Sequence, residues 1–411
     1  MAINISVSRL SRLHEASKDG LILLILTQVE AKDGVTVPTI VNSVSELHDK
    51  FEVRTSGSPA APVPAGLYQM YTAEYLLSTG ATLLVYPTAD AGAFNINTDG
   101  PNLLDIEELD YKLILAPYTF IGDPGTNITQ LAKLVQSTDS TGSTTGCLNL
   151  SAQLFLDLKL DGIFESTAQL TDPTKTLLNT VRTTPKIEVY ANGGPASFYS
   201  KVTGLPTLGT DGFIGVPASA IAAARKAKLL RDKMPFIPVA GKDNGAVAEI
   251  TTLYKKLSTF EKEELQANNI NVLTTKLGLG PLFVSQNTMV PSDDPREPLR
   301  RSHAITLALW FKREVVKAAY EFEYAPNNTK TWALLELKLR KLFDDIYESD
   351  GLEERAGILL GRATTSANDI KAGKLNIIIN FIPVNVLREI NINLNVIGEP
   401  NIIEAVVGGG I

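Results

Sequence analysis

Both ends of the chain alternate apolar and polar residues with a period of two. Residues 3–8 alternate isoleucine and valine with asparagine and serine, and residues 390–396 alternate isoleucine, leucine and valine with asparagine. This is the period of a β-strand that buries one face. A further short apolar run follows at 402–407. We therefore predict a strand at the start of the chain and two strands at its end.

Between these ends, apolar segments of strand length alternate with segments of helical periodicity. Strands are expected over residues 21–27, 81–87, 270–273 and 282–284, and further strands or buried segments over 111–118, 147–155 and 186–190. Helices are expected over 44–51, 68–77, 217–231, 304–323 and 331–348. Alternating strands and helices are typical of layered α/β structures. The predicted fold class is therefore α/β, or α+β mixed.

The segment 257–289 carries the clearest local signals. Ser258 and Glu261 have the spacing of a capping box, which predicts the start of a helix. The asparagines at 268–269 suit the left-handed conformation in which helices end. The glycines at 278–280 then predict a turn between two short strands. None of these residues forms a pattern typical of a nucleophile or a metal site.

Composition and charge exclude several classes of protein. The 411 residues are enough for two or three domains, and 44% hydrophobic with 20% charged residues is ordinary for a folded chain. A net charge of −7 does not favour nucleic-acid binding. Cys147 is the only cysteine, so an intrachain disulfide and a CxxC metal site are excluded. The N-terminus lacks the apolar core of a secretory signal, and no apolar run is long enough for a bilayer. We expect a soluble protein without direct membrane insertion.

Candidate chemistry is sparse. The three histidines lie far apart in the sequence without metal-binding spacing. The Gly-Leu-Gly at 278–280 is no dinucleotide fingerprint, because Phe283 stands where the third glycine belongs and a strand follows. We predict no catalytic residue, cofactor or metal. A cytoplasmic α/β enzyme with a site assembled from distant residues stays as an alternative.

Besides 257–289, three long segments begin VPASAIAAARKAKLLR at 216–247, PREPLRRSHAITLALWF at 295–332 and TTSANDIKAGKLNI at 364–394. Together with 257–289 they resemble contractile tail sheath proteins through most of 215–397, and the segment 72–88 resembles the family more loosely. Two features depart from the family. Tyr324 and Ala325 separate Phe-Glu from the proline that usually follows it, and the N-terminus lacks the usual Pro-Gly-Val-Tyr opening.

The resemblance implies a domain organisation. It implies an N-terminal arm at 1–20, an outer α/β domain at 21–214, an inner C-terminal α+β domain at 215–397 and a C-terminal arm at 398–411. Terminal strands exchanged between subunits would complete the sheet of the inner domain, which would touch the tube.

The resemblance also implies a function. Subunits would polymerise as six-fold helical rings around a tail tube and contract to drive the tube through the target cell envelope. The implied partners are further copies of the chain, the tail tube protein, and baseplate and tail terminator proteins. The chain would be part of a virion tail sheath assembled in the host cytoplasm, with genome ejection as the result in a phage. A bacteriocin-like particle, an injection system and a non-contractile filament or shell remain alternatives.

The same resemblance assigns roles to individual residues. The exchanged strands would contain Ile3, Ile5, Val7, Ile402, Ile403, Val406 and Val407. The hinge of the C-terminal arm would contain Gly398 and Pro400, and a second hinge would lie within 11–20. Candidate tube contacts are Lys338, Arg340, Lys341, Asp344 and Asp345. The alternative is that residues 3–8 and 402–407 form edge strands in the sheets of their own subunit.

Overall fold

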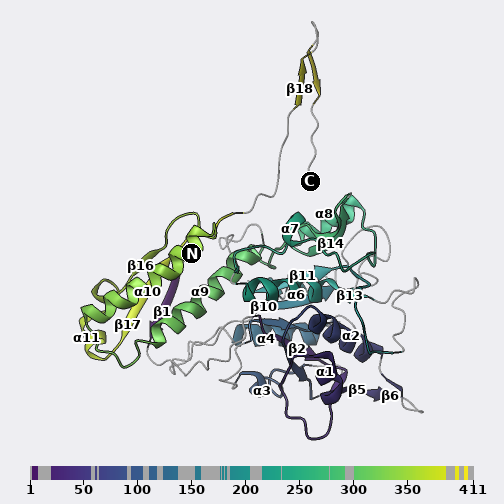
Figure 1. Ribbon diagram of the computed structural model, residues 1–411, viewed down its shortest axis with the longest axis horizontal. Coiled ribbons are helices and arrows are strands. Elements are labelled where there is room, and N and C mark those ends of the chain that lie inside the picture. Colours follow the sequence, from purple (N-terminus) through teal and green to yellow (C-terminus); the bar gives the residue numbers. More distant parts are fainter. Residues whose placement is uncertain are drawn as a thin grey trace.

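The computed structural model places one large sheet at the centre of the chain (Figure 1). The structure describes residues 2–7, 20–56, 61–62, 64–89, 94–104, 111–117, 124–137, 153–158, 176, 178–179, 181–182, 186–203, 215–232, 234–276, 278–291, 300–385, 394–397 and 402–405. From edge to edge, the sheet contains β15 (Gly280–Phe283), β14 (Asn271–Lys276), β11 (Ile187–Ala191), β10 (Gln153–Leu158), β9 (Leu113–Leu115), β2 (Ile22–Leu26), β8 (Leu83–Pro87) and β4 (Thr39–Val41).

The strands from β14 to β8 run parallel, and an antiparallel strand closes each edge of the sheet. Every residue of β2, β8, β9 and β11 is buried, as in parallel sheets that are covered on both faces. Along β2, Ile22 and Leu24 pack into one core and Leu23 and Ile25 into another. The two cores lie on opposite faces because successive side chains of a strand alternate.

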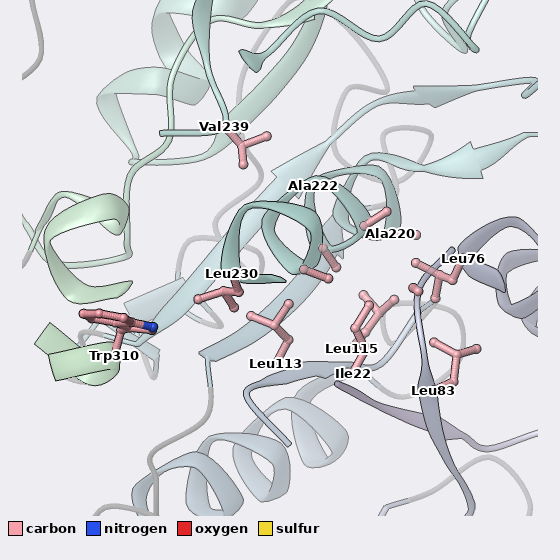
Figure 2. Packing of buried hydrophobic residues seen from close by; sticks show 14 of the residues in the cluster. Ile22, Leu76, Leu83, Leu113, Leu115, Ala220, Ala222, Leu230, Val239 and Trp310 are labelled. Carbon is pink, nitrogen blue, oxygen red and sulfur yellow. The ribbon is translucent and has the colours of Figure 1, made fainter. Parts of the chain in front are cut away.

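Helices cover both faces of this sheet. They are α1 (Val44–Lys50), α2 (Pro64–Ser78), α3 (Pro101–Leu104), α4 (Pro124–Ser137), α6 (Ala218–Arg231), α7 (Gly241–Asn244) and α8 (Thr259–Ala267). Figure 2 shows α6 lying along the sheet, with Ala220 and Leu230 facing Ile22, Leu113 and Leu115. The small alanine side chains let this helix approach the sheet closely.

A second, smaller sheet lies beside two long helices. It contains β1 (Ala2–Val7), β17 (Leu375–Asn380) and β16 (Gly357–Leu359) in that order, all antiparallel. The helices α9 (Ser302–Tyr320) and α10 (Thr329–Glu348) pack against each other and against this sheet. Phe311 of α9 stacks on Phe343 of α10 with ring centroids 4.0 Å apart, and Phe381 meets Phe311 edge-on at 5.0 Å. These rings form the centre of the smaller unit.

Short elements complete the described chain. Two-stranded pairs form between β3 (Val29–Ala31) and β5 (Phe51–Val53), β6 (Thr55–Ser56) and β7 (Ala61–Pro62), β12 (Gly193–Gly194) and β13 (Val216–Pro217), and β18 (Leu394–Ile397) and β19 (Ile402–Ala405). A 3-10 turn η3 (Gly361–Ala363) and the short helix α11 (Ala367–Lys371) precede β17.

Most predicted elements are confirmed. The capping box of α8 is present in full, and Asn269 has the left-handed φ of +60° expected after that helix. Strand β10 begins at Gln153, and residues 147–152 lie outside the described part of the chain. Residues 390–393, the first part of the strand expected at 390–396, also lie outside the described residues. The rest of that expected strand belongs to β18.

The domain boundary expected between residues 214 and 215 cuts through the large sheet. β14 and β15 lie C-terminal to that position, yet β14 pairs with β11 through Tyr190 and Asn271. Helix α6 also covers the same sheet. The segment 257–289, which the expected organisation assigns to the inner domain at 215–397, therefore contributes to the large sheet and not to the smaller unit. The smaller unit begins with α9.

Candidate functional site

The N-terminal strand occupies one edge of the smaller sheet. β1 pairs with β17 over six positions, from Ala2 opposite Asn380 to Val7 opposite Leu375. On β17, Ile377 and Ile379 are buried and Asn380 is exposed. If the pairing shifted by one residue, the side chains of the shifted strand would exchange their buried and exposed faces, so burial specifies the register.

The expected apolar positions of β1 follow that register. Ile3 lies opposite Ile379, and Ile5 lies opposite Ile377. These are the buried positions of β17. In this single chain β1 is therefore an edge strand of its own sheet, as the alternative interpretation has it. Its exchange between subunits stays a prediction.

The C-terminal segment forms a separate hairpin. β18 and β19 pair antiparallel, with Val396 opposite Ile403 and Ile397 opposite Ile402. Figure 1 shows this hairpin standing apart from both sheets. The other expected arm residues, Val406 and Val407, and the expected hinge residues Gly398 and Pro400 lie outside the described residues.

The end of the expected N-terminal hinge is tightly placed. Gly20 has a φ of +84°, and a Cβ added there would lie 2.4 Å from the carbonyl oxygen of Ala227 in α6. A side chain cannot be accommodated at that distance without movement of the backbone. The large sheet is thus anchored to α6 where β2 begins, and residues 8–19 lie outside the described part of the chain.

Three of the five expected tube contacts are paired within the chain. Lys338 forms an ion pair with Glu321 next to the start of the α9–α10 turn. The guanidinium of Arg340 lies 2.7 Å from the carboxylate of Glu336, one helical turn earlier. The carboxylate of Asp344 lies 3.9 Å from the guanidinium of Arg355.

Lys341 and Asp345 are exposed and lie on one stripe of α10. The stripe also contains two exposed leucines, Leu334 at 50% and Leu337 at 67% exposure. Spacings of three and four residues place all of them on one face of the helix. These two leucines were not among the expected contacts, although their spacing from Lys341 is visible in the sequence.

A buried ion pair joins the large sheet to α9. The Lys226 Nζ atom of α6 lies 2.6 Å from the Glu188 Oε1 atom of β11 and donates to the Ser302 Oγ atom at 2.6 Å. Ser302 is the first residue of α9 and donates to the same carboxylate at 2.6 Å. The hydroxyl of Tyr190 and the amide of Gln286 donate to the other carboxylate oxygen, Glu188 Oε2. This cluster was not predicted, because its members are distant in sequence.

This cluster contains a serine beside a lysine, an arrangement that in some hydrolases forms a nucleophile. Here Ser302 and Glu188 are 0% exposed and Lys226 is 3% exposed, so a substrate has no access. Burial lowers the pKa of Lys226, and the attraction and hydrogen bond of Glu188 oppose that shift. The carboxylate accepts bonds at both oxygens, and the cluster acts as a structural connection between α6, β11 and α9.

A second buried carboxylate lies near a histidine and a serine. Glu74 is 0% exposed, lies 2.6 Å from the Nε2 atom of His48 and accepts bonds from the hydroxyl of Ser200 and the backbone N–H of Lys201. In a hydrolase triad the histidine stands between the serine and the carboxylate. Here the carboxylate stands in the middle, so this arrangement holds the segment around Ser200 on α2 and does not activate the hydroxyl.

The described residues contain no cluster of three or more His, Cys, Asp or Glu side chains suited to a metal ion. None of the helices in the described ranges combines the length and apolar character needed to cross a bilayer.

No protein-family model matches the chain, and no curated protein matches it by sequence. Its fold is nevertheless shared with solved sheath proteins. The sheath complex of an extracellular contractile injection system, PVC, in the contracted state has a TM-score of 0.64 at 14% identity, covering 93% of each chain. The contracted helical sheath of the anti-feeding prophage has a TM-score of 0.62 at 16% identity, covering 93% of this chain and 94% of that one.

A crystal structure from a third source agrees. The sheath tail protein of Listeria innocua has a TM-score of 0.54 at 10% identity, covering 90% of this chain and 93% of that one. The fold of this chain is therefore the fold of these solved sheath proteins. The resemblance noted in separate sequence segments extends, as a likeness of fold, over 93% of this chain.

Proposed function

We propose that this chain is the structural subunit of a contractile sheath. The observation that carries the proposal is the likeness of fold to two contracted sheaths over 93% of this chain. The role is mechanical and not enzymatic, which agrees with the inaccessible Lys226–Ser302 pair. One of the two similar sheaths belongs to an extracellular contractile injection system, so the proposal covers an injection system as well as a phage tail and does not include genome ejection.

Subunits would assemble as six-fold rings stacked helically around a tube. The terminal strands would connect neighbours, since strand addition uses backbone hydrogen bonds for affinity and alternating side chains for register. At about 1 kcal/mol net per hydrogen bond and ~25 cal/mol per Å² of apolar burial, a short strand contributes several kcal/mol. Contraction would be a rigid-body rearrangement of folded subunits into a lattice with more contact.

The acceptor for such strands would be the smaller sheet. β17 has β1 on one side and β16 on the other, and the far side of β16 ends the sheet in the described chain. Leu359 on β16 is 49% exposed. An exposed edge strand with an exposed leucine is suited to a further strand, and the C-terminal strand β19 of another subunit is our candidate.

The tube would be contacted by the exposed stripe of α10. Leu334 and Leu337 offer apolar contact, and Lys341 and Asp345 offer charges that are individually worth ~0–1 kcal/mol when exposed. Such a contact is weak enough to be released during contraction. Baseplate and terminator proteins are the further partners that this role requires.

Polymerisation of the purified chain tests the proposal. We expect concentration-dependent tubes in negative-stain micrographs, and a chain that stays monomeric at high concentration contradicts a sheath role. Removal of residues 399–411 should abolish the tubes without a change in circular dichroism. Removal of 408–411 alone leaves β19 intact and is the matched control. Tubes formed without 399–411 would disprove the C-terminal strand exchange while leaving the sheath role standing.

A further inference from the structure

The edge of β17 that would receive a neighbour's N-terminal strand is already occupied. β1 of the same chain pairs with it continuously over six positions, with Ile3 opposite Ile379 and Ile5 opposite Ile377. The opposite edge of β17 pairs with β16, where Ile358 lies opposite Ile379. A strand has only two edges, so no further strand can pair with β17 while β1 is in place.

A neighbour's copy of β1 has the same sequence and therefore competes for the same register. The two strands differ only in how they are held. A strand tethered to its acceptor within one chain has an effective concentration of roughly millimolar. A free neighbour at about micromolar concentration is thus outcompeted by roughly a thousandfold.

We infer that β1 is a latch that closes its own acceptor edge in the free subunit, so that polymerisation proceeds by displacement of β1 and not by simple addition. This inference rests on the proposed function. The apparent affinity for a neighbour is then the affinity of the released subunit multiplied by the fraction of subunits whose β1 is released. Growth is then fast only where other contacts already hold the incoming subunit in place.

The two ends of the chain differ in how firmly they are held. β1 lies in a three-stranded sheet beside α9, where Ile377 and Ile379 are buried. β19 pairs with β18 in a two-stranded hairpin. An isolated hairpin of two strands is at best marginally stable in water. The C-terminal strand therefore opens first on assembly, and release of β1 is the slower step.

A reversible covalent lock tests the latch in the full-length chain. Ala2 and Asn380 lie opposite each other, and Asn380 is exposed, so cysteines at both positions disturb little. Opposite residues of antiparallel strands are within the Cα spacing of a disulfide. The variant carries Ala2→Cys, Asn380→Cys and Cys147→Ser, and the control carries Asn380→Cys and Cys147→Ser only.

Oxidation of the dilute variant should give an intrachain disulfide, seen as a monomer of altered mobility on a non-reducing gel. This locked monomer should form no tubes, and a reductant should restore them at the rate of the control. Oxidation after assembly should instead crosslink neighbouring subunits into covalent ladders. The second pair Asn4→Cys and Ile378→Cys, in the same Cys147→Ser background, gives the same readout if the first pair disturbs the fold.

Two results would overturn the latch. One is a locked monomer that polymerises at the rate of its reduced form. The other is a dilute variant that yields no intrachain disulfide with either cysteine pair, because β1 is then not held by its own β17. A wild-type chain that forms no tubes, but whose variant still gives the intrachain disulfide, contradicts the proposed function instead.

Discussion

Lys226 and Glu188 form a buried ion pair, with 2.6 Å between Nζ and Oε1 and neither side chain more than 3% exposed. They come from α6 and β11. The hydroxyl of Ser302, at the start of α9, accepts a hydrogen bond from Lys226 and donates one to Glu188. The pair therefore lies where the large sheet meets the smaller unit. Trp310, further along α9, lies near Leu230 of α6 in the same core (Figure 2).

Removal of the lysine charge should be strongly destabilising. Lys226→Met leaves the carboxylate of Glu188 buried without its cation, which typically costs about 3–5 kcal/mol. We expect this loss in the free energy of unfolding, measured by denaturant titration.

The matched control removes both charges. Lys226→Met combined with Glu188→Gln should recover a substantial part of the loss, because a neutral amide no longer requires a cation. Equal stability of the single and double variants would mean that the charge of Glu188 is not what makes Lys226 necessary.

The close approach of Gly20 to α6 should make that glycine irreplaceable. Gly20→Ala meets both a positive φ and the carbonyl oxygen of Ala227. Gly34 has a similar φ of +82° but has no atom within 4 Å of an added Cβ, so Gly34→Ala isolates the backbone contribution. We expect Gly34→Ala to lower the free energy of unfolding by about 1–2 kcal/mol. Gly20→Ala should lower it by roughly 1–3 kcal/mol more. Similar melting temperatures of the two variants would contradict the contact with Ala227.

The exposed stripe of α10 should matter for tube binding and not for folding. Leu337→Asp and Lys341→Glu change exposed side chains, so stability should stay within about 0.5 kcal/mol of wild type. Co-sedimentation of the sheath with tail tubes should fall. Lys242→Glu changes an exposed lysine on α7 and is the charge-matched control. Unchanged tube binding by both α10 variants would remove α10 from the proposed interface.

The capping box of α8 should contribute to stability in a pH-dependent manner. Burial raises the pKa of Glu261, but bonds from the backbone and hydroxyl of Ser258 and from Lys255 prevail and hold it below the ordinary value of 4.5. The unfolded chain then binds the proton more tightly, so this contribution is present above pH ~4.5 and is lost as the pH falls through the folded pKa.

Glu261→Gln should therefore be less stable than wild type at pH 7, with the difference shrinking below pH ~4. Glu263→Gln, which removes an exposed carboxylate outside the capping box, is the control. A constant difference between wild type and Glu261→Gln from pH 7 to pH 3 would disprove the assignment. Thermal melts at several pH values provide the measurement.

Local signals in the sequence predicted local structure well. The Ser258–Glu261 spacing located the start of α8, and Asn269 located its end. The helix expected over 217–231 is α6, which runs over Ala218–Arg231 with Pro217 as its N-cap residue. These features depend on residues within one or two helical turns, whose conformational preferences are visible in the sequence.

Features that depend on distant residues were missed. Glu188 lies in an apolar strand and Lys226 in an alanine-rich helix, and only the folded chain brings them together. The pairing of β14 with β11 likewise joins residues that the expected boundary at 214 had separated. Pairing between distant strands follows from the topology of the sheet, which periodicity alone does not encode.

The order of strands along the chain has a consequence for protein synthesis. In the large sheet, β8 and β9 both pair with β2. After them, β10 pairs with β9, β11 with β10, β14 with β11 and β15 with β14. That sheet can grow as the chain leaves the ribosome. β1 is made first, but its partner β17 begins only at Leu375. At about 5–20 residues per second, β1 waits roughly 20–75 seconds unpaired. Chains emerging close together on one messenger therefore present free N-terminal strands to each other's completed subunits, and assembly competes with closure of the latch while translation is still under way.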